Sequence, residues 1–168
     1  QRARRLRGTW EGESFDLTAL NWHLTLAHIP AAALPAVCER LLFSVSDTRS
    51  LLDTAVLVQQ PGLLARDAPP SQISARLDGM SAVALLAGWI ISEDDRLRRY
   101  YRDWRHVRPQ TNGHSLRALG LEPGPQYRRI LERLRAAWLD GEVSSAEQED
   151  ALLRVLLESV ERESHDST

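Results

Sequence analysis

The chain has 168 residues and a mass of 19.0 kDa, enough for one domain or two small ones, each with its own core. Its 43% hydrophobic and 26% charged residues are typical of a globular protein, and it contains neither an apolar run of about 18 residues nor a secretory signal. A single cysteine, Cys38, excludes an internal disulfide and a cysteine-based zinc site. All 21 basic residues are arginine, which excludes mechanisms that need a lysine.

The net charge of −2 is divided into four blocks of alternating sign. Residues 1–10 carry +4, residues 11–95 carry −7, residues 96–139 carry +8 and residues 140–168 carry −7. A +8 stretch in a nearly neutral chain produces a local field that attracts polyanions. The same arginines could instead be solvated or pair with the acidic C-terminal block, and the charge pattern leaves both alternatives open.

Hydrophobic periodicity and turn residues predict helices nearly throughout, and no stretch alternates with the period of a strand. We expect a first helix that begins at a Ser14 cap and ends at Pro30. A second is expected over 31–44, and a third begins at a Ser46 cap and ends at Pro61.

Residues 68–70 are expected to form a linker before a short helix over 71–78. The segment 81–91 is apolar on all sides, which is typical of a buried central helix. Ser92 should cap a helix over 93–107, whose first turn holds three acidic residues. We interpret these acids as capping groups rather than metal ligands, because three consecutive helical residues point in different directions.

The remaining helices follow a turn at 109–113 and are predicted over 115–119, over 125–139, and from a cap at Ser144 or Ser145 to about Glu161. The predicted fold class is therefore an all-α multi-helix bundle of about eight helices without a sheet. We expect four regions along the chain: a basic N-terminal arm over 1–13, a helical body over 14–108, a helical tail domain over 109–163 and a disordered tail over 164–168.

Catalytic motifs are missing from the sequence. It has no Gly-x-Ser-x-Gly, Walker A, Gly-x-Gly-x-x-Gly, His-Glu-x-x-His or Asp-x-Asp pattern. The five histidines are scattered along the chain, and we interpret each as non-catalytic. We therefore predict no catalytic residue, no metal ligand and no cofactor site in this chain.

Two helices combine an apolar side with flanking arginines. On the 93–107 helix, Arg98, Arg102 and Arg105 form a stripe beside aromatic residues that we expect to be core rather than base-stacking groups. Arg128 and Arg135 flank the apolar side of the 125–139 helix in the same way. Guanidinium groups match the geometry of phosphate and stay charged at any working pH, so these stripes are candidate phosphate contacts.

Between these helices, the sequence Leu-Arg-Ala-Leu-Gly-Leu-Glu-Pro-Gly-Pro over 116–125 predicts a helix, a glycine turn and a second helix. The free N–H groups at the start of the second helix would suit a phosphate. Pro125 removes one donor there and Glu122 opposes an anion, so a tight helical hairpin and a phosphate clamp remain equal alternatives.

One segment of the sequence resembles a known protein family. The run 112–141 is similar to the C-terminal part of class II tRNA nucleotidyltransferases, the family of CCA-adding enzymes and bacterial poly(A) polymerases. Their pattern is Gly, two residues, Leu, then Gly-Leu-x-Pro-Gly-Pro, then Ile-Leu and a helix that ends in Leu-Asp-Gly. The positions that match are Gly113, Leu116, Gly120, Pro123, Gly124, Pro125, Ile130, Leu131, Leu139, Asp140 and Gly141. The segments 71–77 and 101–107 look similar to the family's body helices.

The family's catalytic parts have no counterpart here. Its head carries a Gly-Ser motif and an Asp-x-Asp metal pair, and its neck carries Glu-Asp-x-x-Arg, whereas Glu93-Asp94 is followed by Leu97 at the arginine position. The resemblance therefore implies a body and tail that hold tRNA, or another RNA, by its backbone in the cytoplasm. A missing N-terminal head would add the nucleotides, and that parent nucleotidyltransferase would need Mg²⁺ and nucleoside triphosphates.

The resemblance and the arginine stripes together give a set of candidate RNA-binding residues. Contacts to phosphates would position the RNA without reading its sequence. The set comprises Arg98, Arg102, Arg105, Arg108, Arg117, Gly120, Gly124, Arg128 and Arg135. Two alternatives remain: a protein-interaction module that forms a homodimer through the acidic 140–168 block, and a helix-hairpin-helix DNA binder that uses residues 116–130.

Overall fold

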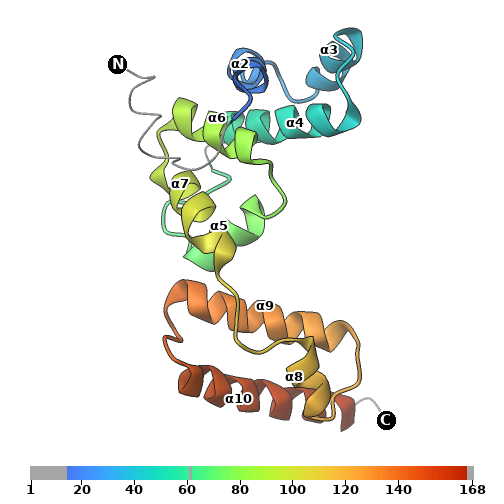
Figure 1. Cartoon of the computed structure of the whole chain (residues 1–168), viewed down its shortest axis with the longest axis vertical. Helices are drawn as coiled ribbons and strands as arrows, with labels where there is room; N and C mark the ends of the chain where they lie inside the picture. Colours follow the sequence, from blue (N-terminus) through green and yellow to red (C-terminus); the bar gives the residue numbers. More distant parts are fainter. Residues whose placement is uncertain (1–14, 61, 166–168) are drawn as a thin grey trace. The chain divides into compact units, whose positions relative to one another are not determined.

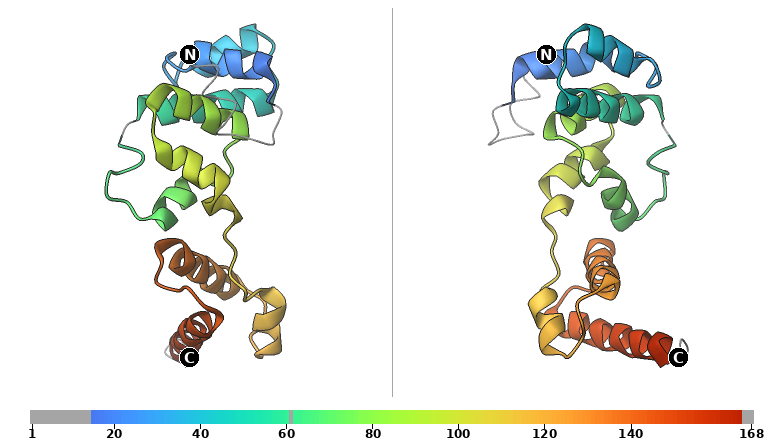
Figure 2. Two further views of the ribbon diagram at one scale, coloured as in Figure 1. Left: turned by 60° about the vertical axis from the view of Figure 1, so that its left-hand side comes forward. Right: turned by 90° about the vertical axis from the view of Figure 1, so that its right-hand side faces the viewer.

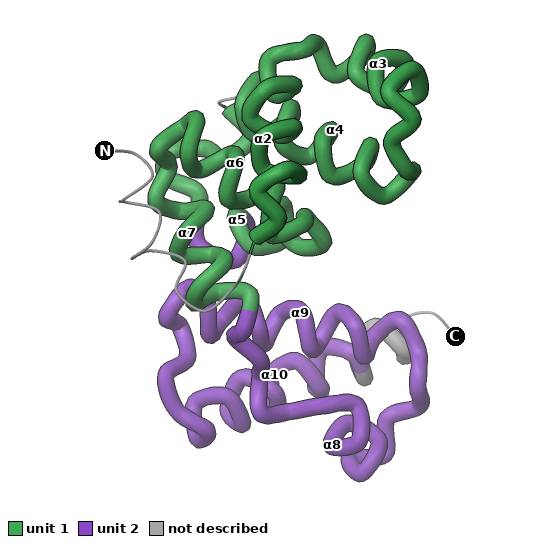
Figure 3. Tube along the Cα trace, turned by 45° about the horizontal axis from the view of Figure 1, so that its top comes forward, with its two compact units in different colours: residues 1–68, 73–105 green, residues 69–72, 106–168 purple. Residues whose placement is uncertain are grey.

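The computed structural model describes residues 15–60 and 62–165, so the predicted arm over 1–13 and the Ser14 cap lie outside the described residues. Over these ranges the chain forms nine α-helices, one 3-10 turn and no strand, which confirms the all-α prediction (Figure 1). None of these helices is long and apolar enough to cross a membrane. The chain divides into two compact units, residues 1–68 with 73–105 and residues 69–72 with 106–168 (Figure 3).

Unit 1 is built around an apolar central helix. Its helices are α2 (Leu17–Leu26), α3 (Leu34–Arg40), α4 (Val45–Gln59), most of α5 (Pro70–Leu77), α6 (Ala82–Ser92) and α7 (Asp95–Arg102), followed by a 3-10 turn, η1 (Trp104–His106). Helix α6 packs against α2, α4 and α7, as the views in Figure 2 show. Residues 84–88 of α6 are all buried, which confirms the predicted central helix.

Two apolar clusters fill unit 1. The first surrounds α6 and includes Leu85, Leu97 and Tyr100, and the second lies between α2, α3 and α4 around Leu34 and Cys38. The aromatic side of α7 is therefore core, as its spacing predicted. Cys38 has no exposed surface and belongs to the core as well.

Several helix starts before α6 differ from the sequence prediction. Helix α2 is capped by Asp16, whose carboxylate accepts a hydrogen bond of 2.8 Å from the Thr18 amide. Helix α4 is capped by Ser44 and not by Ser46, because Ser44 is extended and accepts from the Asp47 amide at 3.1 Å. Pro70, predicted to be linker, is the first residue of α5.

The predicted 93–107 helix is shorter than expected at both ends. Glu93 has a left-handed backbone, with φ of 56°, and caps the end of α6, so it is not part of the first turn of α7. Asp94 is the true N-cap and accepts from the Arg96 amide at 3.0 Å. The α-helix ends at Arg102, and the chain continues as η1.

Unit 2 contains α8 (Gly113–Ala118), α9 (Pro125–Asp140) and α10 (Ala146–His165). Leu116, Ile130, Leu134 and Leu153 form its core, and α9 packs against α10. Asn112 caps α8 in a capping box with Ser115, which places the start of this helix two residues before the predicted one.

Two glycines in left-handed conformation end the helices of unit 2. Gly120 follows α8 with φ of 86°, and Gly141 follows α9 with φ of 74°, as the turn chemistry predicted. Helix α10 begins in the second of the two predicted registers, because the Ser145 hydroxyl accepts from the Gln148 amide at 3.4 Å. It extends past Glu161 to His165.

Candidate nucleic-acid interface

The three arginine candidates of unit 1 lie along α7 and η1. Arg98 pairs with Asp95 at 3.5 Å, and Arg102, whose side chain is 71% exposed, pairs with Asp103 at 3.3 Å. The Arg105 guanidinium lies 3.5 Å from the centre of the Tyr101 ring in a cation–π contact. Because Tyr101 is buried in the core, this contact fixes the position of Arg105 at the surface of unit 1.

Two further arginines of the +8 block behave differently from each other. The Arg96 guanidinium donates hydrogen bonds to both carboxylate oxygens of Asp94. It also donates to the carbonyls of Leu64, at 3.1 Å, and Ala65, at 2.8 Å. The hydrogen bonds from Arg96 lower the pKa of Asp94, although burial alone would raise it. Arg99 is exposed and has no hydrogen-bond or ion-pair partner among the described residues. Arg96 is therefore a structural arginine, whereas Arg99 is an exposed charge.

In unit 2, Arg108 and Arg135 meet at one backbone oxygen. Arg108 Nη1 donates to the Val107 carbonyl at 2.9 Å, and Arg135 Nε donates to the same carbonyl at 3.3 Å. Arg108 is exposed, and Arg135 is half-buried on α9. The structure thus brings together two candidates that lie on different segments of the chain.

A buried carboxylate anchors the segment that follows Arg108. Glu149 on α10 is only 1% exposed and accepts hydrogen bonds from the backbone amides of Gln110, at 3.0 Å, and Thr111, at 2.7 Å. The indole of Trp138 on α9 donates to it at 2.5 Å. Burial alone would raise the pKa of Glu149, but these hydrogen bonds outweigh it, so the pKa lies below the usual value and the group stays ionised.

The turn between α8 and α9 holds the other candidates. Arg117 on α8 is exposed, and it has no hydrogen-bond or ion-pair partner in the part of the chain that the structure describes. Arg128 on α9 is 84% exposed and forms an ion pair of 2.7 Å with Glu132. Gly120 provides the left-handed turn, and Gly124 is the N-cap of α9, without a side-chain cap.

The residues of the family-like run have clear roles in folding. Leu116, Ile130 and Leu134 are core residues, Pro125 occupies the first turn of α9, and Gly141 ends that helix. Asp140 accepts two hydrogen bonds from Ser71, from the amide at 2.8 Å and from the hydroxyl at 2.6 Å. The run therefore encodes a helical hairpin, and its exposed arginines are additions to that scaffold.

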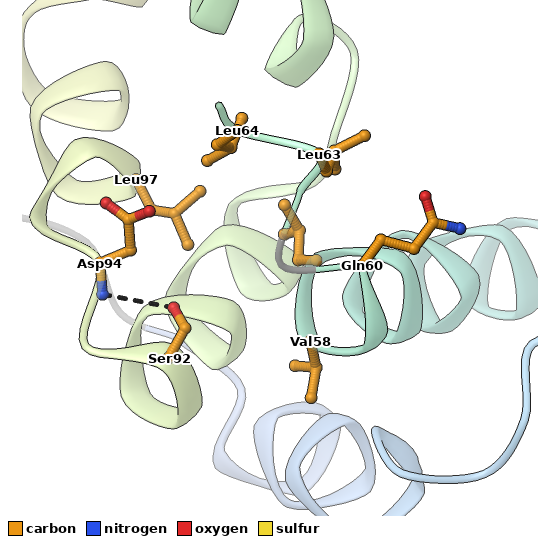
Figure 4. Close-up of a pocket in the computed structure, with 8 residues that line it drawn as sticks. Val58, Gln60, Leu63, Leu64, Ser92, Asp94 and Leu97 are labelled. Carbon is orange, nitrogen blue, oxygen red and sulfur yellow. Dashed lines mark hydrogen bonds between the residues drawn. The ribbon is translucent and has the colours of Figure 1, made fainter. Parts of the chain in front are cut away.

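A shallow pocket of about 210 Å³ opens in unit 1 between the end of α4 and the start of α7 (Figure 4). Its wall is mainly apolar, with Leu57, Leu63, Leu64 and Leu97, and its polar groups include Ser92 and Asp94. The Asp94 amide donates to the Ser92 hydroxyl at 3.3 Å, and the Asp94 carboxylate is held by Arg96. Both polar groups thus serve the α6–α7 junction, and the pocket offers no nucleophile with an adjacent base.

Across 15–60 and 62–165, no three His, Cys, Asp or Glu side chains lie close enough to hold a metal ion. His23, the most buried of the described histidines, has a pKa lowered to about 4 by burial, and its ring contacts hydroxyl groups instead of carboxylates. No step of nucleotide transfer can be derived from these side chains.

Sequence reasoning missed the roles of Val107 and Glu149. Val107 acts through its backbone carbonyl, which accepts from Arg108 and Arg135, and the order of side chains in the sequence does not indicate such a contact. Glu149 had a signal: it lies on the apolar face of α10, four residues before Leu153 and seven before Leu156. An acidic residue on an apolar helix face indicates a buried carboxylate with dedicated donors.

Comparison with known proteins gives one distant relationship. The chain is 26% identical over 149 residues to the A-adding tRNA nucleotidyltransferase of Geobacter sulfurreducens. The match covers 82% of this chain but only 17% of that protein's length. No family model matches the chain, and no solved structure matches it. The chain is thus distantly similar to part of a tRNA nucleotidyltransferase, which supports the relationship suggested by the 112–141 run.

Proposed function

We propose that this chain is an RNA-holding region of a tRNA nucleotidyltransferase and that it binds the phosphate backbone of tRNA. The observation that carries the proposal is the exposed guanidinium of Arg117, beside the α8–α9 turn of the family-like run. An exposed arginine without a protein partner is available to a phosphate without breaking any contact in the fold. Arg128, on the next helix, gives up only a surface ion pair when it binds.

In this proposal, another part of the protein carries out nucleotide transfer. The similarity to a nucleotidyltransferase covers 17% of that enzyme, and the described residues lack a carboxylate cluster for Mg²⁺. We therefore assign nucleotide transfer, with its metal ions and nucleoside triphosphates, to a head domain outside this chain. The helices of this chain would position the RNA, in the cytoplasm where tRNA is processed.

The experiment is a titration of tRNA binding against salt with paired arginine variants. Arg128→Gln and Arg162→Gln are matched, because each removes an exposed arginine that pairs with a glutamate four residues away on the same helix. The proposal predicts that Arg128→Gln weakens tRNA binding several-fold and lowers the salt dependence by about one phosphate contact. Arg162→Gln, in the acidic block, should leave both unchanged.

Three results would contradict the proposal. Equal loss in both variants would mean that binding follows net charge and not the α8–α9 surface. Tighter binding to duplex DNA than to tRNA would favour a helix-hairpin-helix DNA binder. A salt-dependent dimer without RNA binding would favour the interaction module.

A further inference from the structure

We propose that Arg108 and Arg135 form a single site for one phosphate of the RNA backbone, and that Glu149 is the positioning residue that holds this site in place. This inference rests on the proposed function and names one subsite within it. Neither the pairing of these two arginines nor a role for Glu149 follows from the arginine stripes.

The first step is the shared oxygen. Arg108 and Arg135 each use one N–H to bind the Val107 carbonyl, at 2.9 and 3.3 Å, so their guanidinium groups lie beside each other. A guanidinium carries five N–H donors, so an arginine that already has partners in the protein can still donate to one of the two unesterified oxygens of a phosphodiester. The carbonyl orients both groups before RNA arrives, which reduces the entropy lost on binding.

The second step is the anchoring of the segment that carries the carbonyl. Residues 107–111 lack regular structure, and only tertiary contacts can fix their backbone. Glu149 supplies such contacts through the amides of Gln110 and Thr111, immediately after Arg108 and Pro109. Because Trp138 donates to the same carboxylate from α9, Glu149 ties the segment to the helix that carries Arg135.

The test uses Glu149→Gln in the full chain, with Glu147→Gln as the matched control. Both variants remove one negative charge from the first turn of α10, but Glu147 is exposed, whereas Glu149 is buried. A glutamine at 149 places an NH₂ group where the carboxylate accepts an N–H, so part of the anchor is lost.

The two variants should differ in tRNA affinity. Removal of a negative charge favours binding of a polyanion, so Glu147→Gln should bind tRNA equally or more tightly. Glu149→Gln should bind about tenfold more weakly, as loss of charge-assisted hydrogen bonds to one phosphate would produce. If Glu149→Gln binds like Glu147→Gln, the positioning role is overturned. If the unmodified chain does not bind tRNA, the proposed function falls and this inference with it.

A second set of variants tests the site when Glu149→Gln does not fold by circular dichroism. Arg108→Gln, Arg135→Gln and the double variant form a double-mutant cycle in tRNA affinity. A shared phosphate predicts that the double variant loses less than the product of the two single losses, and that its salt slope falls by about one contact. Independent losses, with a slope lower by about two contacts, would overturn the shared site.

Discussion

His23 on α2 and Thr54 on α4 are joined by a hydrogen bond of 2.6 Å between the Nδ1 and Oγ1 atoms in the interior of unit 1. His23 is 4% exposed and Thr54 has no exposed surface. The other ring nitrogen lies 3.3 Å from the Ser50 hydroxyl, which in turn contacts Ser81 at the start of α6. The imidazole thus links α2 to α4, and Ser50 extends this chain of contacts to the start of α6.

This arrangement predicts a loss of stability in mild acid. Burial lowers the pKa of His23 from 6.5 to about 4, although the charge of Asp47 opposes the shift. In the unfolded chain the His23 imidazole is protonated below about pH 6.5, whereas in the folded chain it is protonated only below about pH 4. Stability is therefore complete above pH 6.5 and falls as the pH approaches 4, by up to about 3 kcal/mol.

Urea unfolding between pH 7.5 and pH 5.5 measures the onset of this loss, because carboxylates with ordinary pKa values remain mostly ionised in that window. The His23→Gln variant should be less stable at neutral pH but should show little change over the same range. An identical pH dependence in the two proteins would show that His23 is not responsible.

A strained leucine provides a second prediction. Leu42, after α3, has a φ of 58°, and its amide and that of Phe43 donate to carbonyls at the end of the helix. The side chain is 91% exposed, so replacement by glycine removes little packing and relieves the backbone strain. Leu42→Gly should raise the unfolding free energy by up to about 1 kcal/mol.

The neighbouring position serves as the control for Leu42. Leu41 has a φ of −91°, so Leu41→Gly gains nothing from relief of strain and should destabilise the protein. Thermal unfolding of the two variants compares the signs directly. Destabilisation by Leu42→Gly would mean that the exposed leucine makes a stabilising contact in solution.

Arginines of the +8 block should separate into those that stabilise the fold and those that are only exposed charges. Arg96→Gln loses the contacts to Asp94 and to two backbone carbonyls, and should lower the unfolding free energy by about 2 kcal/mol. Arg99→Gln removes an exposed side chain without a partner in the described ranges, and should leave stability unchanged within about 0.5 kcal/mol. Equal stability of the two variants, measured by urea unfolding, would contradict this division.

The sequence predicted the helices well where a local signal ends them. Gly120 and Gly141 adopt the left-handed backbone expected at helix ends. Predicted boundaries were wrong where two polar residues compete for one cap. Ser44 and Ser46 are chemically alike, and only the extended backbone of Ser44 makes it the cap of α4.

The candidate site was predictable only in its composition. Arg108 and Arg135 were both predicted as candidate phosphate contacts, but they lie 27 residues apart in the sequence. Their shared contact is a backbone carbonyl, which every residue possesses, so the sequence does not show that they lie close together. The charge of the +8 block also counts Arg96 and Arg99 alike, because the carbonyls of Leu64 and Ala65 that accept hydrogen bonds from Arg96 come from a distant segment of the chain. Tertiary packing decides which guanidinium groups face the solvent.

The central claim is that the chain holds tRNA by its phosphates, and the most direct measurement is binding of tRNA and of duplex DNA of matched length from about 50 to about 200 mM salt. We expect tighter binding to tRNA, with an affinity that falls steeply as salt increases. Weak and equal binding to both nucleic acids, independent of salt, would contradict it, and the arginines of α7, α8 and α9 would then be a solvated surface.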